Sequence, residues 1–246
     1  MSVHYELRDR VAVITIDRPE RRNAIDRATA LALAEAWIRF EEDAEADVGV
    51  LTGGDGTFCA GADLKVFDLE DDDGGFLGFT RTRVSKPTIA AIEGHCIAGG
   101  LEIALWCDLR VAAQDAVFGC YERRFGVPLV DGGTQRLPRI VGLGRAMDMI
   151  LTGRPVDANE AHDIGLANRI TPTGEALPTA VDLGRRIASF PQPTVRSDRA
   201  AVLDGIGVYF VDGLEIERTH GRGVLDVAAR GAAEFARGLG RHGGGV

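Results

Sequence analysis

Residues 88–106 read TIAAIEGHCIAGGLEIALW, and this stretch decides the class of fold. Its first five residues are mainly apolar and follow Pro87, a pattern typical of a short buried strand. Glycine-rich sequence at 94–100 then separates this strand from a helical pattern at 101–106. Another strand pattern follows at 108–112 (DLRVA). Strands that alternate with helices through glycine-rich turns predict an α/β layered core.

The residues before this stretch predict a hairpin, a helix and a further strand. Two alternating runs, 3–7 (VHYEL) and 11–16 (VAVITI), lie on either side of a polar break and predict two paired strands. Asp26 is placed to cap a helix over 28–42, and 48–52 (VGVLT) predicts a buried strand. The apolar stripe of that helix is expected at Leu31, Ala34 and Ile38.

The C-terminal third of the chain is helical in pattern. Apolar periodicity predicts helices at 134–141, 145–152, 158–164, 181–190, 196–203, 214–222 and 227–239. We therefore expect two parts, a core at 1–190 that carries the functional site and a helical region at 191–246. The glycine tail at 243–246 is expected to be disordered.

Charge and composition exclude several classes of protein. A formal net charge of -9 disfavours nucleic acid as the main partner, because phosphate binding requires a basic surface. No apolar signal region begins the chain and no run approaches a membrane span, so we expect no membrane association. Four cysteines without a CxxC pair indicate reduced, buried thiols and a cytoplasmic protein.

Two glycine-flanked glutamates are the best candidates for chemistry. Glu102 ends the run AGGLE, and Glu122 lies within FGCYERRFG. Gly99, at the start of a predicted helix, and the corner 60–63 (AGAD) can each present a backbone N–H group to a ligand. Carboxyl groups beside such donors have the parts needed for acid–base chemistry at a carbonyl whose oxygen becomes negative.

Each of these features also has a plain structural interpretation. The glycine corners can be tight turns, Glu102 a surface acid in the first turn of a helix, and Glu122 a partner of Arg123 or Arg124. Asp131 can be a turn residue or a third acid. The five histidines lack ligand spacing, so no metal is expected, and no GxSxG, Rossmann or Walker motif is present.

Read together, these segments resemble the crotonase (enoyl-CoA hydratase/isomerase) superfamily. The resemblance keeps order and spacing from residue 11 to about 170. The motifs that carry it are 18–25 (RPERRNAI), 58–65 (FCAGADLK), 86–94 (KPTIAAIEG), 98–108 (AGGLEIALWCD), 132–138 (GGTQRLP), 151–161 (LTGRPVDANEA) and 165–168 (GLAN).

The resemblance implies a fold and an activity. The fold is a spiral of ββα units followed by a helical trimerisation region, assembled as a homotrimer or as a hexamer of two trimers. The activity is that of an enoyl-CoA hydratase, in which Glu102 and Glu122 bind and activate water while the N–H groups of Ala62 and Gly99 hold the enolate oxygen. The partner is an acyl-CoA thioester in fatty acid metabolism, and coenzyme A is part of the substrate, so no separate cofactor is implied. Substrate or CoA contacts are implied at Arg22, Ala24, Ala60, Asp63, Leu64 and Lys65.

Departures from the family pattern keep two other functions open. Arg123, Arg124 and Asp131 are unusual near the acyl pocket, and Ala98 stands where many hydratases have glycine. One alternative is an enoyl-CoA isomerase or a dehydratase that acts on an unusual acyl group. The other is a non-catalytic acyl-CoA-binding protein that keeps the fold.

Overall fold

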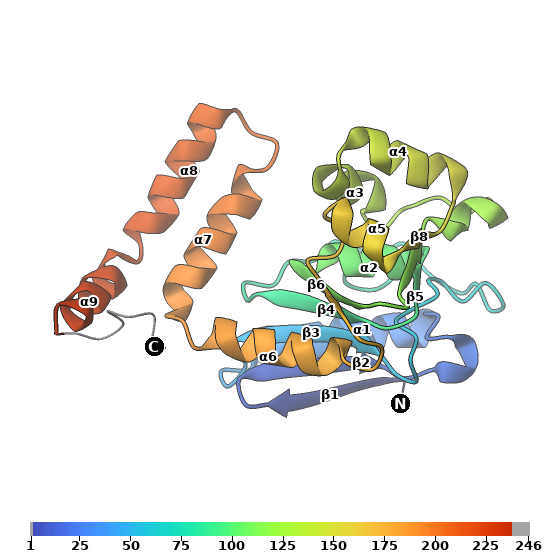
Figure 1. Ribbon diagram of the computed structural model, residues 1–246, viewed down its shortest axis with the longest axis horizontal. Helices are drawn as coiled ribbons and strands as arrows, with labels where there is room; N and C mark the ends of the chain where they lie inside the picture. The colour runs from blue at the N-terminus through green and yellow to red at the C-terminus, as the bar shows by residue number, and fades with distance from the viewer. Residues whose placement is uncertain (1, 238–246) are drawn as a thin grey trace.

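A six-stranded sheet forms the centre of the computed structural model, which describes residues 2–237 (Figure 1). The strand order is β1-β2-β3-β4-β6-β9; β1 and β2 form an antiparallel hairpin and the remaining neighbours are parallel. The strands span Val3–Arg8 (β1), Val11–Ile16 (β2), Val48–Gly53 (β3), Thr88–Ile92 (β4), Leu109–Ala113 (β6) and Arg169–Thr171 (β9). The predicted hairpin and α/β core are confirmed.

Apolar side chains on both faces of the sheet explain why β2, β3 and β4 are nearly continuous apolar runs. On one face, β2, β3, β4 and β6 pack against α6 (Ala176–Ala188), which lies in front of β2 and β3 in Figure 1. The opposite face supports α1 (Arg27–Glu42) and α2 (Gly99–Trp106) through the larger part of the core. Burial on both sides fixes the register of the strands, and hence the place where each strand ends.

A small second sheet, which the sequence did not predict, positions the start of α2. It contains β5 (His95–Ile97), β7 (Val117–Gly119) and β8 (Val156–Asp157) in the order β5-β7-β8. Strands of two or three residues are too short to give a periodic pattern, so only their pairing partners define them. The same limitation applies to β9, which also was not predicted.

The first long helix buries a different face from the one its sequence predicted. Asp26 caps α1 as expected, because its carboxylate accepts a hydrogen bond of 2.9 Å from the Thr29 N–H. The predicted stripe was wrong: Leu31 and Ile38 are exposed, whereas the opposite side of the helix packs into the core. The buried residues of α1 are Thr29, Ala30, Leu33, Ala36, Trp37 and Phe40. Trp37 and Phe40 offer more apolar area to bury than the predicted stripe does.

The remaining helices follow the sheet in chain order. They span Gly133–Val141 (α3), Leu143–Thr152 (α4), Ala158–Asp163 (α5), Ala176–Ala188 (α6), Gln192–Gly205 (α7), Phe210–Arg222 (α8) and Leu225–Ala236 (α9), with short 3-10 helices at Pro19–Arg21 (η1) and Tyr121–Phe125 (η2). Helices α7 and α8 pair with each other and, with α9, stand apart from α3–α5 in Figure 1. Arg199 of α7 ties this group to the core through a 2.7 Å ion pair with Asp108.

Two further observations bear on the sequence predictions. All four cysteines are buried free thiols, as expected. Within residues 2–237, no helix combines the length and apolarity that a membrane crossing requires. The division into parts at 1–190 and 191–246 stays a prediction, and the tail at 243–246 lies outside the described residues.

Candidate active site

One mainly apolar cavity of about 260 Å³ contains most of the predicted site residues. We call residues 60–64 and 97–102 the donor wall, and residues 67–77 and 121–131 the acyl wall. Of the predicted residues, those that line the cavity are Ala60, Ala62, Leu64, Gly99, Glu102, Glu122 and Asp131. The cavity therefore brings together both glutamates and both predicted amide donors.

The two predicted amide donors lie close together because β5 is bonded to the turn before Ala62. Cys59 forms an isolated parallel bridge with Cys96 of β5, with hydrogen bonds of 2.9 and 3.2 Å on either side. A methyl group on the Cα of Gly99 would lie 3.6 Å from the Ala62 nitrogen. Among the described residues, neither the Ala62 N–H nor the Gly99 N–H donates to a protein acceptor. Both are free to bind one ligand oxygen.

The backbone of Ala98 makes a turn just before helix α2, so that the N–H of Gly99 lies at the start of the helix. Its backbone has φ 52° and ψ -130°, a conformation that non-glycine residues adopt only when the surrounding structure enforces it. The enforcing contact is a 2.8 Å hydrogen bond from the Ala98 N–H to the Gly119 carbonyl, next to the pairing of β5 with β7. The helix dipole adds to the attraction for negative charge at this point.

Glu102 is fixed by one of its oxygens and buried. Its Oε1 accepts hydrogen bonds from the Gly133 N–H at 2.8 Å and the Asp131 N–H at 3.0 Å. The side chain is 3% exposed, and its pKa is raised to about 8, chiefly by burial, with the charges of Asp131 and Glu122 adding to the shift. A carboxyl group in this setting holds its proton near neutral pH.

Glu122 faces the same cavity and is much less constrained. It lies in η2 and is 5% exposed, and no protein group in the described structure hydrogen-bonds to either carboxyl oxygen. Burial raises its pKa, and the charge of Arg123 partly opposes that shift. An unpartnered buried carboxyl is costly, so such a group in a cavity indicates a binding position for a polar ligand or water.

Asp131 supplies a third buried carboxyl, and it is engaged in structure. Its Oδ1 accepts a hydrogen bond from the Thr80 hydroxyl and one of 3.2 Å from the Leu77 N–H, which joins the two segments of the acyl wall. Burial raises its pKa. The guanidinium of Arg136 donates hydrogen bonds to the backbone carbonyls of Asp131 and Thr80, and so links the same two residues through their main chains.

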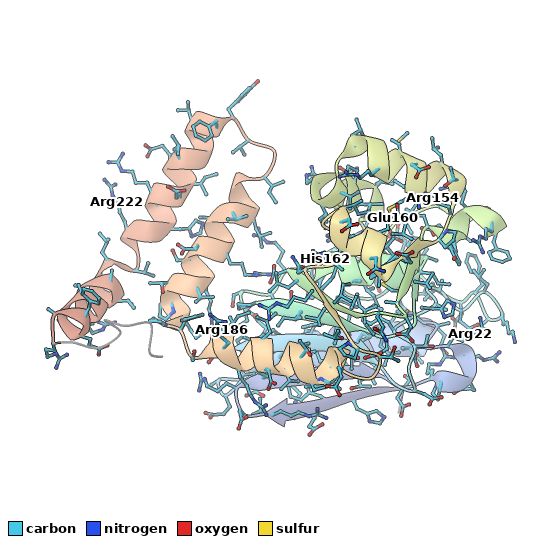
Figure 2. All side chains as sticks on the ribbon, in the orientation of Figure 1. Arg22, Arg154, Glu160, His162, Arg186 and Arg222 are labelled. Atoms are coloured by element: carbon cyan, nitrogen blue, oxygen red, sulfur yellow. The ribbon has the colours of Figure 1, made fainter. Side chains whose placement is uncertain are left out.

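The other four predicted contact residues do not line the cavity. Asp63 is buried in the donor wall, where Arg18 pairs with it at 3.2 Å, and Arg18 also donates to the Ala24 carbonyl. These contacts shape the turn that presents Ala62. Arg22 and Lys65 point outward from neighbouring segments, and Arg22 lies at the opposite end of the molecule from α7–α9 (Figure 2).

The sequence did not identify the residues that make the cavity apolar. They come mainly from the acyl wall and are Phe67, Leu69, Phe76, Leu77, Phe125, Val127, Pro128 and Val130. Irregular segments give no periodic pattern, so the only available signal was aromatic and aliphatic residues inside glycine-rich loops. Arg27 holds part of this wall through ion pairs with Glu70 and Asp72 of the acidic run.

The chain matches known proteins over most of its length. A family model described as enoyl-CoA hydratase/isomerase matches residues 6–205. A crotonyl-CoA hydratase of Syntrophomonas wolfei is 36% identical over 214 residues, which cover 83% of this chain and 82% of that protein. A probable enoyl-CoA hydratase of Mycobacterium tuberculosis is 34% identical over 242 residues, which cover 95% of this chain and 94% of that protein.

A solved structure agrees with these sequence matches. The crystal structure of an enoyl-CoA hydratase from Mycobacterium marinum superposes with a TM-score of 0.92 at 36% sequence identity, and covers 96% of each chain. The likeness therefore includes the helical C-terminal region as well as the sheet, and the predicted spiral fold is confirmed.

Proposed function

The chain is a hydro-lyase of the enoyl-CoA hydratase/isomerase family, and we propose that it adds water across the 2,3 double bond of a 2-enoyl-CoA thioester at the cavity that contains Glu102 and Glu122. One observation carries the proposal: within residues 2–237, no protein group bonds to either oxygen of buried Glu122, in the cavity that Glu102 also lines. A water molecule between the two carboxyls would satisfy them.

The free amides of Ala62 and Gly99 would bind the thioester oxygen. Attack at Cβ moves electron density through the double bond onto that oxygen, which becomes an enolate. Two fixed N–H donors, one of them at a helix start, stabilise this charge more than they stabilise the neutral carbonyl. Removal of one such donor typically costs about 10²–10³ in kcat.

Water addition would use the two glutamates as a pair that shares one proton. The ionised carboxyl accepts a proton from water as the water oxygen forms its bond to Cβ. The protonated carboxyl gives its proton to Cα as the enolate collapses, so the pair ends with the same number of protons. Burial raises the pKa of both side chains, which keeps one proton on the pair near neutral pH.

The test is the variant Glu122→Gln, which preserves size and removes the acid. We expect crotonyl-CoA hydration to fall by about 10²–10⁴ in kcat with a much smaller change in KM, because general acid–base catalysis is lost. Mass spectrometry for added water is the readout. Glu175→Gln, an exposed acid at the start of α6, is the control. Near-wild-type turnover in the Glu122 variant would refute the proposal.

A second candidate, isomerisation, is favoured by the third carboxyl in the cavity. Asp131 lies beside Glu102, and a group at that place could return a proton to a different carbon of the acyl chain. Incubation with a 3-enoyl-CoA separates the two reactions: double-bond migration without water incorporation supports isomerisation. The non-catalytic alternative is not retained, because both glutamates are present and buried in the cavity.

The nucleotide part of the thioester would lie toward Arg22 and Lys65. Neither side chain pairs with a carboxylate among the described residues, so both charges are available to phosphate groups. Replacement of either by Met should raise KM for all CoA esters by a similar factor, because the nucleotide is common to them.

We also propose the homotrimer, or hexamer of two trimers, that the sequence implies. Its support is a set of exposed apolar residues around α8 and α9, which a single chain leaves uncovered. They are Tyr209, Phe210, Val211, Leu225 and Phe235. Sedimentation velocity tests the assembly. A cytoplasmic location is proposed from the four free thiols, which persist in reducing compartments.

A further inference from the structure

Arg124 is an unexpected residue in the acyl wall. It is the one cationic side chain among the described residues that line the cavity, and its neighbours on that wall are mostly aromatic or aliphatic. Its place follows from η2, a 3-10 helix with three residues per turn, which puts Tyr121 and Arg124 on the same side. Both residues line the cavity.

Two contacts hold the Arg124 side chain in position. Its guanidinium carbon lies 3.5 Å from the centre of the Tyr121 ring, and Nη2 donates a hydrogen bond of 3.1 Å to the Gly153 carbonyl. Stacking on an aromatic ring orients the planar guanidinium without consuming its N–H groups. Most of the donors of Arg124 therefore remain available.

Among the described residues, no carboxylate serves as a counter-ion for the charge of Arg124. No carboxylate in residues 2–237 lies within ion-pair distance of it. Nearby Arg154 shows the contrast, because it pairs with Asp148 at 2.6 Å and with Glu160, whose side chain lies beside it in Figure 2. The adjacent Arg123 also differs: it lies outside the cavity, and its charge lowers the pKa of Glu122.

We propose that Arg124 binds a carboxylate at the far end of the acyl chain, so that the preferred substrates are 2-enoyl-CoA thioesters whose acyl chain ends in a carboxylate. The inference rests on the proposed hydration. Arginine forms two parallel hydrogen bonds with a carboxylate, and such pairs are stronger than neutral hydrogen bonds. The apolar remainder of the cavity would contact the methylene and vinyl carbons between the two ends.

Two of the three buried acids, Glu102 and Asp131, do little to oppose this arrangement. Glu102 holds its proton near neutral pH, and Asp131 accepts hydrogen bonds from Thr80 and Leu77. Repulsion of a substrate carboxylate is therefore limited on that side, whereas Arg124 attracts it. The other ligand that the same guanidinium could bind is a phosphate of CoA, and the experiment distinguishes the two.

The experiment compares hydration of matched pairs of thioesters by the wild-type protein. The pairs are the mono-CoA ester of pent-2-enedioic acid against 2-pentenoyl-CoA, and that of hex-2-enedioic acid against 2-hexenoyl-CoA. We expect kcat/KM for the carboxylated member to exceed that of its neutral partner by about tenfold or more in at least one pair, because of the charge-assisted hydrogen bonds. A ratio at or below one in both pairs overturns the inference, even if crotonyl-CoA is hydrated. Absence of hydration of every thioester, crotonyl-CoA included, refutes the proposed function instead.

The variant Arg124→Gln then tests whether Arg124 is the residue that binds the terminal carboxylate. Glutamine keeps a planar N–H donor and removes the charge, so the ratio should fall to about one. Arg145→Met, which removes an exposed charge on α4 outside the cavity, should keep the wild-type ratio. If kcat/KM instead falls by the same factor for both members of each pair, Arg124 binds the CoA portion, and the inference is overturned. If the Gln variant does not fold, the wild-type ratio alone decides.

Discussion

The donor wall and the acyl wall enclose the same cavity but are built in different ways. The donor wall is held by backbone pairing between β5, β7 and the turn at Cys59, and by the buried pair of Arg18 with Asp63. The acyl wall is irregular chain around η2 and the acidic run, joined by side chains such as Asp131 and Thr80. Backbone geometry thus fixes the amides proposed to hold the thioester oxygen, and side chains shape the part proposed to select the acyl group.

The same contrast separates the two glutamates. Glu102 belongs to α2 and is locked by two backbone N–H groups, whereas Glu122 lies in the acyl wall without a protein hydrogen-bond partner. A substitution in the donor wall should therefore change the rate of the chemical step. Apart from Glu122, which is proposed to take part in the reaction, a substitution in the acyl wall should change the choice of substrate.

After Glu122→Gln, the largest expected effect comes from Gly99→Ala, which would break the donor wall. The new methyl group would lie 2.9 Å from the Leu77 Cδ1 and 3.6 Å from the Ala62 nitrogen, where the thioester oxygen is proposed to bind. We expect kcat for crotonyl-CoA to fall by about 10²–10³, as for the loss of one oxyanion donor. Gly144→Ala is the matched control, because no atom of the described part of the chain lies within 4 Å of the added carbon. Unchanged kcat in Gly99→Ala would show that the oxygen binds elsewhere.

The second prediction concerns the pH dependence of stability. The pKa of Glu102 is raised from 4.5 to about 8 in the folded protein, so between these values the folded state holds a proton that the unfolded state has lost. Stability from this source is complete below the unfolded pKa and declines as pH rises toward the folded one. The free energy of unfolding should fall by up to about 1.4 kcal/mol per pH unit in that window.

Urea denaturation at about pH 5 and pH 7 measures this slope, in the wild type and in Glu102→Gln. The Gln variant cannot ionise at this position, so its free energy of unfolding should fall between pH 5 and pH 7 by up to about 2–3 kcal/mol less than that of the wild type. Equal slopes in the two proteins would mean that Glu102 is not the buried acid with the raised pKa.

The smallest expected effect comes from Phe76→Ala, which opens the acyl wall. Loss of the ring should enlarge the cavity and favour longer 2-enoyl-CoA chains over crotonyl-CoA by about tenfold in kcat/KM, since each methylene is worth ~1–3 kcal/mol in a fitted pocket. Phe190→Ala, outside the cavity, is the control. A uniform loss of kcat without a shift in chain-length preference would contradict the division between the walls.

Sequence patterns predicted the elements that have strong local signals. The β1–β2 hairpin, the Asp26 cap and helix α2 are examples, because periodicity and capping depend on residues a few positions apart. The short strands β5, β7, β8 and β9 and the buried face of α1 were missed or wrong. Those features depend on partners distant in the chain, such as Phe79 and Trp106, which pack against Trp37.

The sequence by itself determined the α/β order, the family and the identity of the two glutamates, since these follow from residue types at fixed spacings. Only the tertiary structure decided that Glu102 is locked and Glu122 free, that the Ala62 and Gly99 amides share one cavity, and that Arg124 lines it unpaired. The physical reason is that burial, desolvation and ion pairing depend on neighbours from other segments of the chain. A local sequence pattern does not predict which distant segments will pack around a given residue.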